Sequence, residues 1–235
     1  MKGMLGILGG MGPLATVDFM EKLIQATPAT RDQEHIPVLA YSVPQVPDRT
    51  AAILAGTDEP LDWMRRGAET LRDGGAEAIA IPCNTAHFWH ERLAEGLGVP
   101  VLHIVDAAAD ALKQSGISGG QVGLLGTTGT IAAGVYQNRF QALGYDCLSP
   151  DDDTQAALVM GGIDAVKAGD LDTGRDKLEA AAETLRQKGC TAIVLGCTEV
   201  PIVLSGAGYI DATEALARAS VAWHLEVMGK ADAAE

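Results

Sequence analysis

Short apolar runs alternate with longer amphipathic segments along the chain. Runs of four to eight apolar residues are typical of strands that are buried on both faces of a parallel sheet. We expect strands at 4–8, 38–43, 77–81, 99–104, 122–125 and 191–195. Helical patterns separate them, near 14–26, 60–73, 86–96, 106–114, 130–143, 154–168 and 174–188. This alternation predicts an α/β fold in which helices cover mostly parallel sheets.

The last segment, "DATEALARASVAWHLEVMG", has the pattern of one more helix. Asp211 is placed to cap its amino end, and Glu214 follows three positions later as in a capping box. Gly229 is a candidate for its end, because glycine often follows the last helical residue.

An internal repeat divides the chain into two similar halves. "LRDGGAEAIAIPCNT" (71–85) aligns without a gap with "LRQKGCTAIVLGCTE" (185–199). "GILGGMG" (6–12) similarly aligns with "GLLGTTG" (123–129), in the same order along the chain. Chance seldom repeats both order and spacing. The repeat therefore predicts two pseudo-symmetric α/β domains of about 100 residues, a typical size for small domains.

The repeat matches two cysteines, Cys83 and Cys197, each of which follows a buried strand. In open α/β sheets, ligands bind beyond the carboxyl ends of the strands. If the two domains face each other, one cleft receives a thiol from each side. Such a pair suits the inversion of a carbon centre, because one thiolate removes a proton and the opposite thiol returns one. The unperturbed thiol pKa is about 8.5, so nearby donors or cations must assist ionisation.

The developing carbanion also needs hydrogen-bond donors around its carboxylate. Asn84, Thr85, Thr198 and the "GTTGT" run at 126–130 have suitable chemistry at strand ends.

Composition and charge limit the classes of molecule that the protein is expected to bind. The net charge of −14 is contrary to a nucleic-acid surface, which needs a basic stripe, but it permits a small anionic substrate held by a few cations. No run of 18 apolar residues occurs, so we expect no membrane span. Four cysteines in 235 residues are too few for a disulfide framework, which favours a reduced, cytoplasmic protein.

The motifs "GILGGMGPLAT", "VPDRT", "IPCNTAH" and "LGCTE" together resemble the aspartate/glutamate racemase superfamily, and most closely its aspartate racemase branch. The resemblance covers essentially the whole chain. It implies a cofactor-independent, homodimeric racemase of an acidic amino acid, with the active site between two domains. The family's C-terminal helix rejoins the first domain. The expected lobes are therefore residues 1–103 with 210–235, and residues 104–209.

The resemblance also implies roles for individual residues. Cys83 and Cys197 would be the two acid/base groups. The α-carboxylate and amine of the substrate would be held by Asn84, Thr85, Thr128 and Thr198. Arg49 and Lys167 match the cations that the aspartate branch uses for the side-chain carboxylate, and arginine can bind a carboxylate through two parallel hydrogen bonds. Met11 and Gly12 would line the cleft. His87 and Glu199 are candidates for supporting positions beside the two cysteines.

Two positions depart from the glutamate racemase branch of this superfamily. That branch has an Asp-Ser pair in its first glycine loop and a histidine after its second Cys-Thr. This chain has "GGMGP" in the loop, and Glu199 follows Thr198. Aspartate is therefore the expected substrate, with glutamate or a broader range of amino acids as the alternative.

The same motifs could also indicate a bound dinucleotide, zinc ion or pyridoxal phosphate, but the sequence supports these interpretations less well. "GMGPLA" (10–15) fits a weak dinucleotide-binding pattern, but the acidic residue expected at the end of the second strand is missing. Cys83, His87 and His90 share a helical spacing, but a zinc site would need a fourth ligand. We therefore expect no metal. Lys167 could in principle form a Schiff base with pyridoxal phosphate, and only the family match supports its role with a carboxylate.

Two further alternatives for the function stay open. One is a maleate-isomerase-like or arylmalonate-decarboxylase-like enzyme of the same fold, which needs a single cysteine. The other is a non-catalytic protein that binds a dicarboxylate between its lobes.

Overall fold

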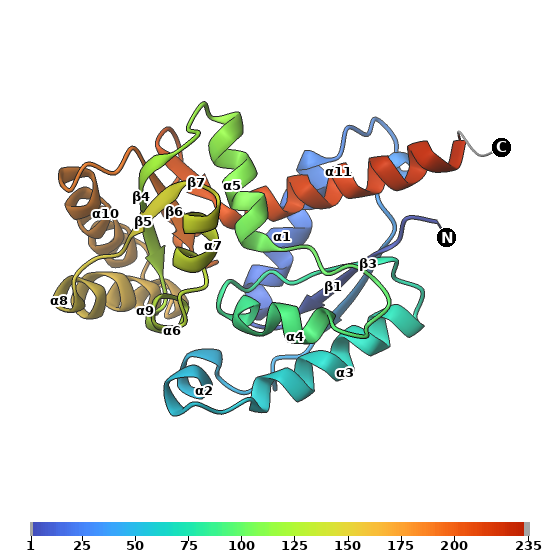
Figure 1. The fold of residues 1–235 in the computed structure, drawn as a ribbon, viewed down its shortest axis with the longest axis horizontal. Coiled ribbons are helices and arrows are strands. Elements are labelled where there is room, and N and C mark those ends of the chain that lie inside the picture. The colour runs from blue at the N-terminus through green and yellow to red at the C-terminus, as the bar shows by residue number, and fades with distance from the viewer. Residues whose placement is uncertain (1, 233–235) are drawn as a thin grey trace.

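Two parallel sheets organise the protein, whose computed structural model describes residues 2–232. The first sheet has the strand order β2-β1-β3 and the second has the order β5-β4-β6-β7. The strands are β1 (Leu5–Gly9), β2 (Val38–Ser42), β3 (Ala78–Ala80), β4 (Gly120–Gly126), β5 (Tyr145–Leu148), β6 (Ala192–Gly196) and β7 (Tyr209–Asp211). Figure 1 shows the sheets in separate parts of the molecule. The predicted α/β fold with two helix-flanked parallel sheets is confirmed.

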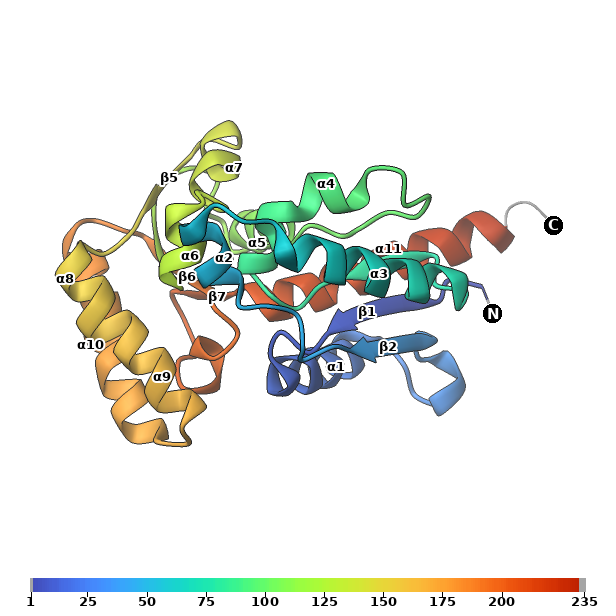
Figure 2. The same cartoon turned by 90° about the horizontal axis from the view of Figure 1, so that it is seen from below.

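Helices flank both sheets (Figures 1 and 2). In the first half they are α1 (Pro13–Ala26), α2 (Arg49–Ala55), α3 (Glu59–Asp73), α4 (His90–Ala94) and α5 (Ile104–Gln114). In the second half they are α6 (Thr128–Ala132), α7 (Gln137–Ala142), α8 (Asp152–Thr154), α9 (Gly161–Lys167), α10 (Leu171–Gln187) and α11 (Ala212–Asp232). Short 3₁₀ turns are η1 (Asp32–Glu34), η2 (Thr85–Trp89) and η4 (Val200–Ile202), and η3 (Gln155–Met160) is a π-helical turn between α8 and α9. None of the described helices is long and apolar enough to cross a membrane.

Several elements differ from the expectation. The run 99–104 forms no strand, and Val101 makes only an isolated bridge to Ile79. The helical pattern at 130–143 divides into α6 and α7. Gly229 does not end α11, because it lacks the positive φ that lets glycine stop a helix. The short elements β5, β7, α2, η1 and η4 were not predicted.

The two sheets share a hydrophobic core. One cluster of buried residues joins Ile7 of β1 to Val194 of β6 through apolar side chains of α5 and α11, including Leu112 and Leu216. Helix α11 packs against α1 and α5 (Figure 1). The C-terminal helix therefore lies where the two sheets are joined.

We propose that the lobe boundaries follow the sheets. The expected first boundary, after residue 103, coincides with the start of α5. The expected second boundary would cut β7, which pairs in parallel with β6. We therefore propose that the second lobe extends to Asp211 and that α11 alone returns to the first lobe.

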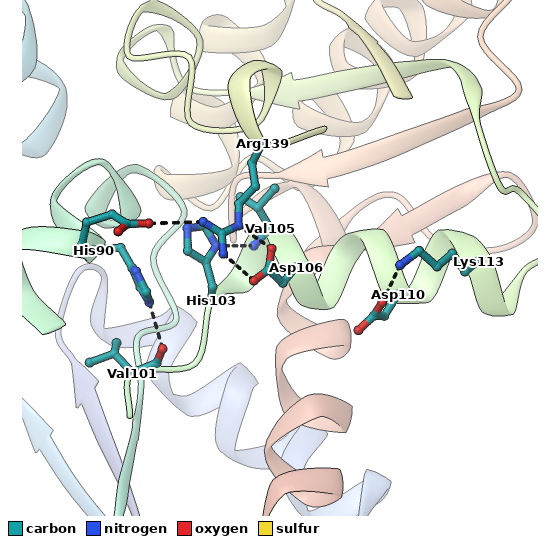
Figure 3. A network of polar contacts seen from close by, with 9 residues as sticks. His90, Val101, His103, Val105, Asp106, Asp110, Lys113 and Arg139 are labelled. Carbon is teal, nitrogen blue, oxygen red and sulfur yellow. Dashed lines mark hydrogen bonds and ion pairs between the residues drawn. The ribbon is translucent and has the colours of Figure 1, made fainter. Parts of the chain in front are cut away.

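A polar network also spans the junction of the two halves (Figure 3). Arg139 of α7 forms an ion pair with Asp106 of α5, with 2.6 Å between Nη2 and Oδ2, and lies 3.4 Å from a carboxylate oxygen of Glu91 in α4. His90 and His103 lie beside this network with their ring centroids 4.3 Å apart. Hydrogen bonds between charged groups thus fix α7 against α4 and α5.

Candidate active site

A cavity of about 280 Å³ lies where loops from both halves meet. Its size is that of a site for a small molecule. Loops after β1, β3, β4 and β6 contribute to its lining, as do the amino end of α2 and the last residue of α9. Because these are carboxyl ends of parallel strands, the cavity lies where ligands bind in open α/β sheets.

Most of the residues singled out from the sequence line this one cavity. They are Met11, Gly12, Arg49, Cys83, Asn84, Thr85, Lys167, Cys197, Thr198 and Glu199. Both cysteines of the internal repeat therefore face the same space, one from each half. Thr128 and His87 are not among the described lining residues.

Cys83 follows β3 and precedes η2, and only 6% of it is exposed. Burial raises the pKa of its thiol, because the thiolate is poorly solvated there. The Arg49 guanidinium and the backbone N–H of Ala86 act in the opposite direction and lower that pKa. The environment of Cys83 thus contains groups that stabilise a thiolate.

Cys197 occupies the matching position after β6 and is equally buried. Burial raises its pKa well above the ordinary value, and the Glu199 carboxylate raises it further. The Cys197 Sγ donates a hydrogen bond to Glu199 Oε2 at 3.0 Å, and Thr198 Oγ1 donates to the same oxygen at 3.2 Å. Lys167 opposes this increase. The environment of Cys197 therefore favours the neutral thiol.

Arg49 and Lys167 bring two cations to the cavity. Arg49 is the first residue of α2, and its Nη1 donates to the carbonyl oxygens of Val46 and Pro47, both at 3.1 Å. Its buried Nε has no hydrogen-bond partner, and Arg49 forms no ion pair with any described residue. Lys167 ends α9, and its side chain forms neither a hydrogen bond nor an ion pair within residues 2–232. Both charges are therefore available to an anionic ligand.

Threonine hydroxyls connect the two halves at the wall of the cavity. Thr85 Oγ1 lies 3.1 Å from Thr127 Oγ1 and 2.9 Å from Thr130 Oγ1, and these last two atoms are 3.0 Å apart. Thr127 lines the cavity and caps α6 by accepting a hydrogen bond from Thr130 N. Thr128 is the first residue of α6 and half-buried. The capping pattern, a threonine just before a helix, was the sequence signal that could have distinguished Thr127 from Thr128.

Asn84 lines the cavity beside Cys83 and is held by a residue that the sequence did not indicate. The Tyr136 hydroxyl donates to Asn84 Oδ1 at 2.6 Å. The amide nitrogen of Asn84 is buried and has no hydrogen-bond partner. No sequence motif surrounds Tyr136, so this contact could be found only in the folded chain.

His87 is buried next to other imidazoles. Its Nε2 lies 3.1 Å from the carbonyl oxygen of Ile81, and its ring centroid is 4.9 Å from that of His103. Burial lowers the pKa of His87 well below its usual value, so the ring is neutral. No group of three or more His, Cys, Asp or Glu side chains in the described chain is placed to hold a metal ion.

Comparisons with known proteins find relatives over most of the chain. The family described as Asp/Glu/hydantoin racemase matches residues 8–220. The broad-specificity amino-acid racemase RacX of Bacillus subtilis is 30% identical over 239 aligned residues, which cover 94% of this chain and 98% of RacX. Among solved structures, the aspartate racemase of Picrophilus torridus superposes with a TM-score of 0.82 at 34% identity, over 94% of both chains. A glutamate racemase of Corynebacterium glutamicum is 37% identical, but over only 60% of this chain and 50% of its own.

Proposed function

Because the chain belongs to the Asp/Glu/hydantoin racemase family, we propose that it interconverts L- and D-aspartate without a cofactor. Cys83 and Cys197 act as the two acid/base groups, on opposite faces of the substrate α-carbon. The observation that carries this proposal is the single cavity lined by both cysteines. The high structural similarity to an aspartate racemase supports the choice of substrate.

The reaction proceeds in two proton transfers. The thiolate of one cysteine takes the α-proton, and the bonding electrons move into the adjacent carboxylate. The thiol of the other cysteine then donates its proton to the opposite face of the planar carbon. The product has inverted configuration, and thiol and thiolate have exchanged places. Each positioned acid or base contributes about 10² to 10⁴-fold.

The remaining rate enhancement comes from stabilising the charge that develops on the α-carboxylate. Asn84, Thr85 and Thr198 line the cavity, and the amide nitrogen of Asn84 is a donor without a partner. On binding, the hydroxyls of Thr85 and Thr198 would turn from their partners in the free protein to donate to this carboxylate. Arg49 and Lys167 would neutralise the side-chain carboxylate of aspartate. The role predicted for Thr128, to hold the α-carboxylate and amine of the substrate, is proposed here as well. Thr127 rather than Thr128 lines the cavity.

Burial and Glu199 raise the pKa of both thiols, that of Cys197 well above its ordinary value, whereas Arg49 lowers the pKa of Cys83, so we infer that Cys83 forms the thiolate more readily. We therefore assign Cys83 as the first base and Cys197 as the first acid. The homodimer and the cytoplasmic location stay predictions.

The proposal is tested by incubating the purified protein with L-aspartate in D₂O without added pyridoxal phosphate. We expect D-aspartate that carries deuterium at the α-carbon. Cys83→Ser and Cys197→Ser should each lower racemisation by at least about 100-fold, because each removes one acid/base group. Cys147→Ser is the matched control, because Cys147 does not line this cavity and should be dispensable.

Other outcomes identify the alternatives. Full activity in one of the two variants would mean that a single cysteine suffices, as in an isomerase or decarboxylase of the same fold. Thermal stabilisation by aspartate without turnover would indicate a binding protein. The similarity to RacX favours a wider substrate range as the second candidate. Chiral analysis with glutamate and neutral amino acids in parallel would reveal it.

A further inference from the structure

A buried tyrosine is hydrogen-bonded to one cysteine loop and lies close to the other, although it does not line the cavity. Tyr136 has no exposed surface and belongs to the core cluster that joins the two sheets. Its hydroxyl donates to Oδ1 of Asn84, the residue after Cys83. A side chain added at Gly196, the residue before Cys197, would lie 3.3 Å from the Tyr136 ring. One side chain from the second half therefore lies beside the neighbours of both cysteines.

The direction of the hydrogen bond between Tyr136 and Asn84 is fixed by chemistry. A buried hydroxyl hydrogen needs an acceptor, and Asn84 Oδ1 is the acceptor that the described chain gives it. Burial raises the pKa of Tyr136 well above its usual value, so the hydroxyl keeps its proton. The amide oxygen of Asn84 is thus occupied by Tyr136, and its amide nitrogen is left without a partner.

Asn84 lines the cavity, and leaving its buried amide nitrogen without a partner is unfavourable unless a ligand satisfies it. A carboxylate does so, because it accepts hydrogen bonds and cannot donate them. If the amide of Asn84 rotated by half a turn, its oxygen would face a substrate carboxylate and repel it. The orientation of this amide therefore decides whether Asn84 assists or opposes binding.

We propose that Tyr136 is a positioning residue that fixes the Asn84 amide so that its nitrogen donates to the substrate α-carboxylate. The aromatic ring also lies beside the backbone before Cys197, so that the positions of both cysteine loops depend on the same side chain. This inference rests on the proposed function for the identity of the ligand as an acidic amino acid.

Tyr136→Phe tests this role because it removes the hydroxyl and keeps the ring. We expect kcat/KM for aspartate to fall by about 10-fold or more, as is typical when a buried hydrogen-bond partner is removed. Tyr145→Phe is the matched control, because its hydroxyl donates to Ile117 O at 2.8 Å and Tyr145 does not line this cavity. That variant should keep its activity and lose a similar amount of thermal stability.

A double-mutant cycle separates positioning from a general structural role. In an Asn84→Ala background, Tyr136→Phe should have no further effect on kcat/KM, because the amide on which Tyr136 acts is absent. An equal loss in both backgrounds would contradict the proposal, as would a Tyr136→Phe variant within twofold of the unchanged protein.

Calorimetric binding of succinate gives a readout that needs no turnover. We expect Tyr136→Phe to weaken succinate binding by about the same factor as it lowers kcat/KM, and Tyr145→Phe to leave it unchanged. A protein that racemises no amino acid would overturn the proposed function, and the succinate comparison would still test Tyr136. Unchanged succinate affinity in Tyr136→Phe would overturn the role of Tyr136 alone.

Discussion

At the scale of single residues, the two cavity cysteines differ mainly in the charge beside them. Both thiols are buried to the same extent, and burial raises both pKa values. Arg49 then lowers the pKa of Cys83, whereas Glu199 raises that of Cys197 and accepts its hydrogen bond. Glu199 also raises the pKa of Cys83, and Lys167 lowers that of Cys197, so the two matching residues differ in which charged group acts on them most strongly. The pseudo-symmetry of the chain does not extend to the electrostatics of its thiols.

Glu199→Gln should make Cys197 ionise at lower pH. The substitution removes the negative charge that raises the pKa of this thiol and keeps a similar shape. The rate of Cys197 alkylation by iodoacetamide can be followed across a pH series by peptide mass spectrometry. The midpoint of this pH profile should shift to lower pH. Glu214→Gln is the control, because its carboxylate pairs with Arg218 and does not line the cavity. A Cys197 profile that is unchanged in Glu199→Gln would contradict this account.

At the scale of elements, the start of α11 connects the second sheet to the first half. Asp211 is the last residue of β7, and its Oδ1 accepts hydrogen bonds from the backbone nitrogens of Thr213 and Glu214. Its Oδ2 lies 2.7 Å from Lys22 Nζ of α1. One carboxylate thus satisfies the amino end of the helix and fixes α11 against α1.

Asp211→Ala should lower the free energy of unfolding by roughly 2 kcal/mol, because a helix cap and a largely buried ion pair are lost together. Asp211→Asn should cost less, since asparagine also caps helices well. Urea denaturation of the two variants measures both values. If asparagine destabilises as much as alanine, the ion pair with Lys22 dominates and the cap contributes little.

The sequence predicts these elements unevenly, for physical reasons. The strands β1, β4 and β6 are buried along most of their length, so their apolar runs are visible. The strand β7 has only three residues, and a period of two cannot be recognised over so short a segment. Helix α2 is similarly short, and its start is visible only through the capping side chain of Asp48.

Candidate site residues, too, could be predicted only where the local sequence carries a signal. Cys83 and Cys197 could be found because the repeat places both at strand ends. Tyr136 could not, because its contact with Asn84 joins positions that are 52 residues apart and depends on how the halves pack. Local motifs identify groups that face the cavity, whereas groups that support them from behind depend on tertiary structure.

At the scale of the whole molecule, neutral imidazoles lie in the junction between the halves. Burial lowers the pKa of His87, His90 and His103, and the last falls to about 3. The nearby Arg139 cation lowers all three further, while Glu91 and Asp106 partly oppose it at His90. The folded protein therefore resists protonation of this cluster.

Stability should consequently depend on pH. The pKa of an unfolded histidine is about 6.5, so the unfolded chain binds more protons than the folded one as the pH falls below that value. The contribution of the cluster is complete above about pH 6.5 and is lost progressively toward pH 3. We expect the free energy of unfolding, measured with urea, to fall between pH 7 and pH 5.

His103→Gln should make this decrease smaller by about 1 kcal/mol at pH 5, because one of the groups that must stay neutral is gone. His35→Gln is the control, because His35 lies outside the cluster, beside β2. A pH dependence that is identical in His103→Gln and in the unchanged protein would show that other groups cause it.

The three hydroxyls of Thr85, Thr127 and Thr130 form a closed triangle, and each carries one hydrogen. Such a ring can circulate its hydrogens clockwise or anticlockwise, and the reversal needs only rotation about C–O bonds. While the triangle is closed, all three hydrogens are donated within it in either sense, so the Thr85 and Thr127 hydroxyls, which line the cavity, can meet a bound molecule only as acceptors. A donor for a bound carboxylate therefore becomes available at Thr85 only when the triangle opens, which needs rotation of one hydroxyl and no movement of the backbone.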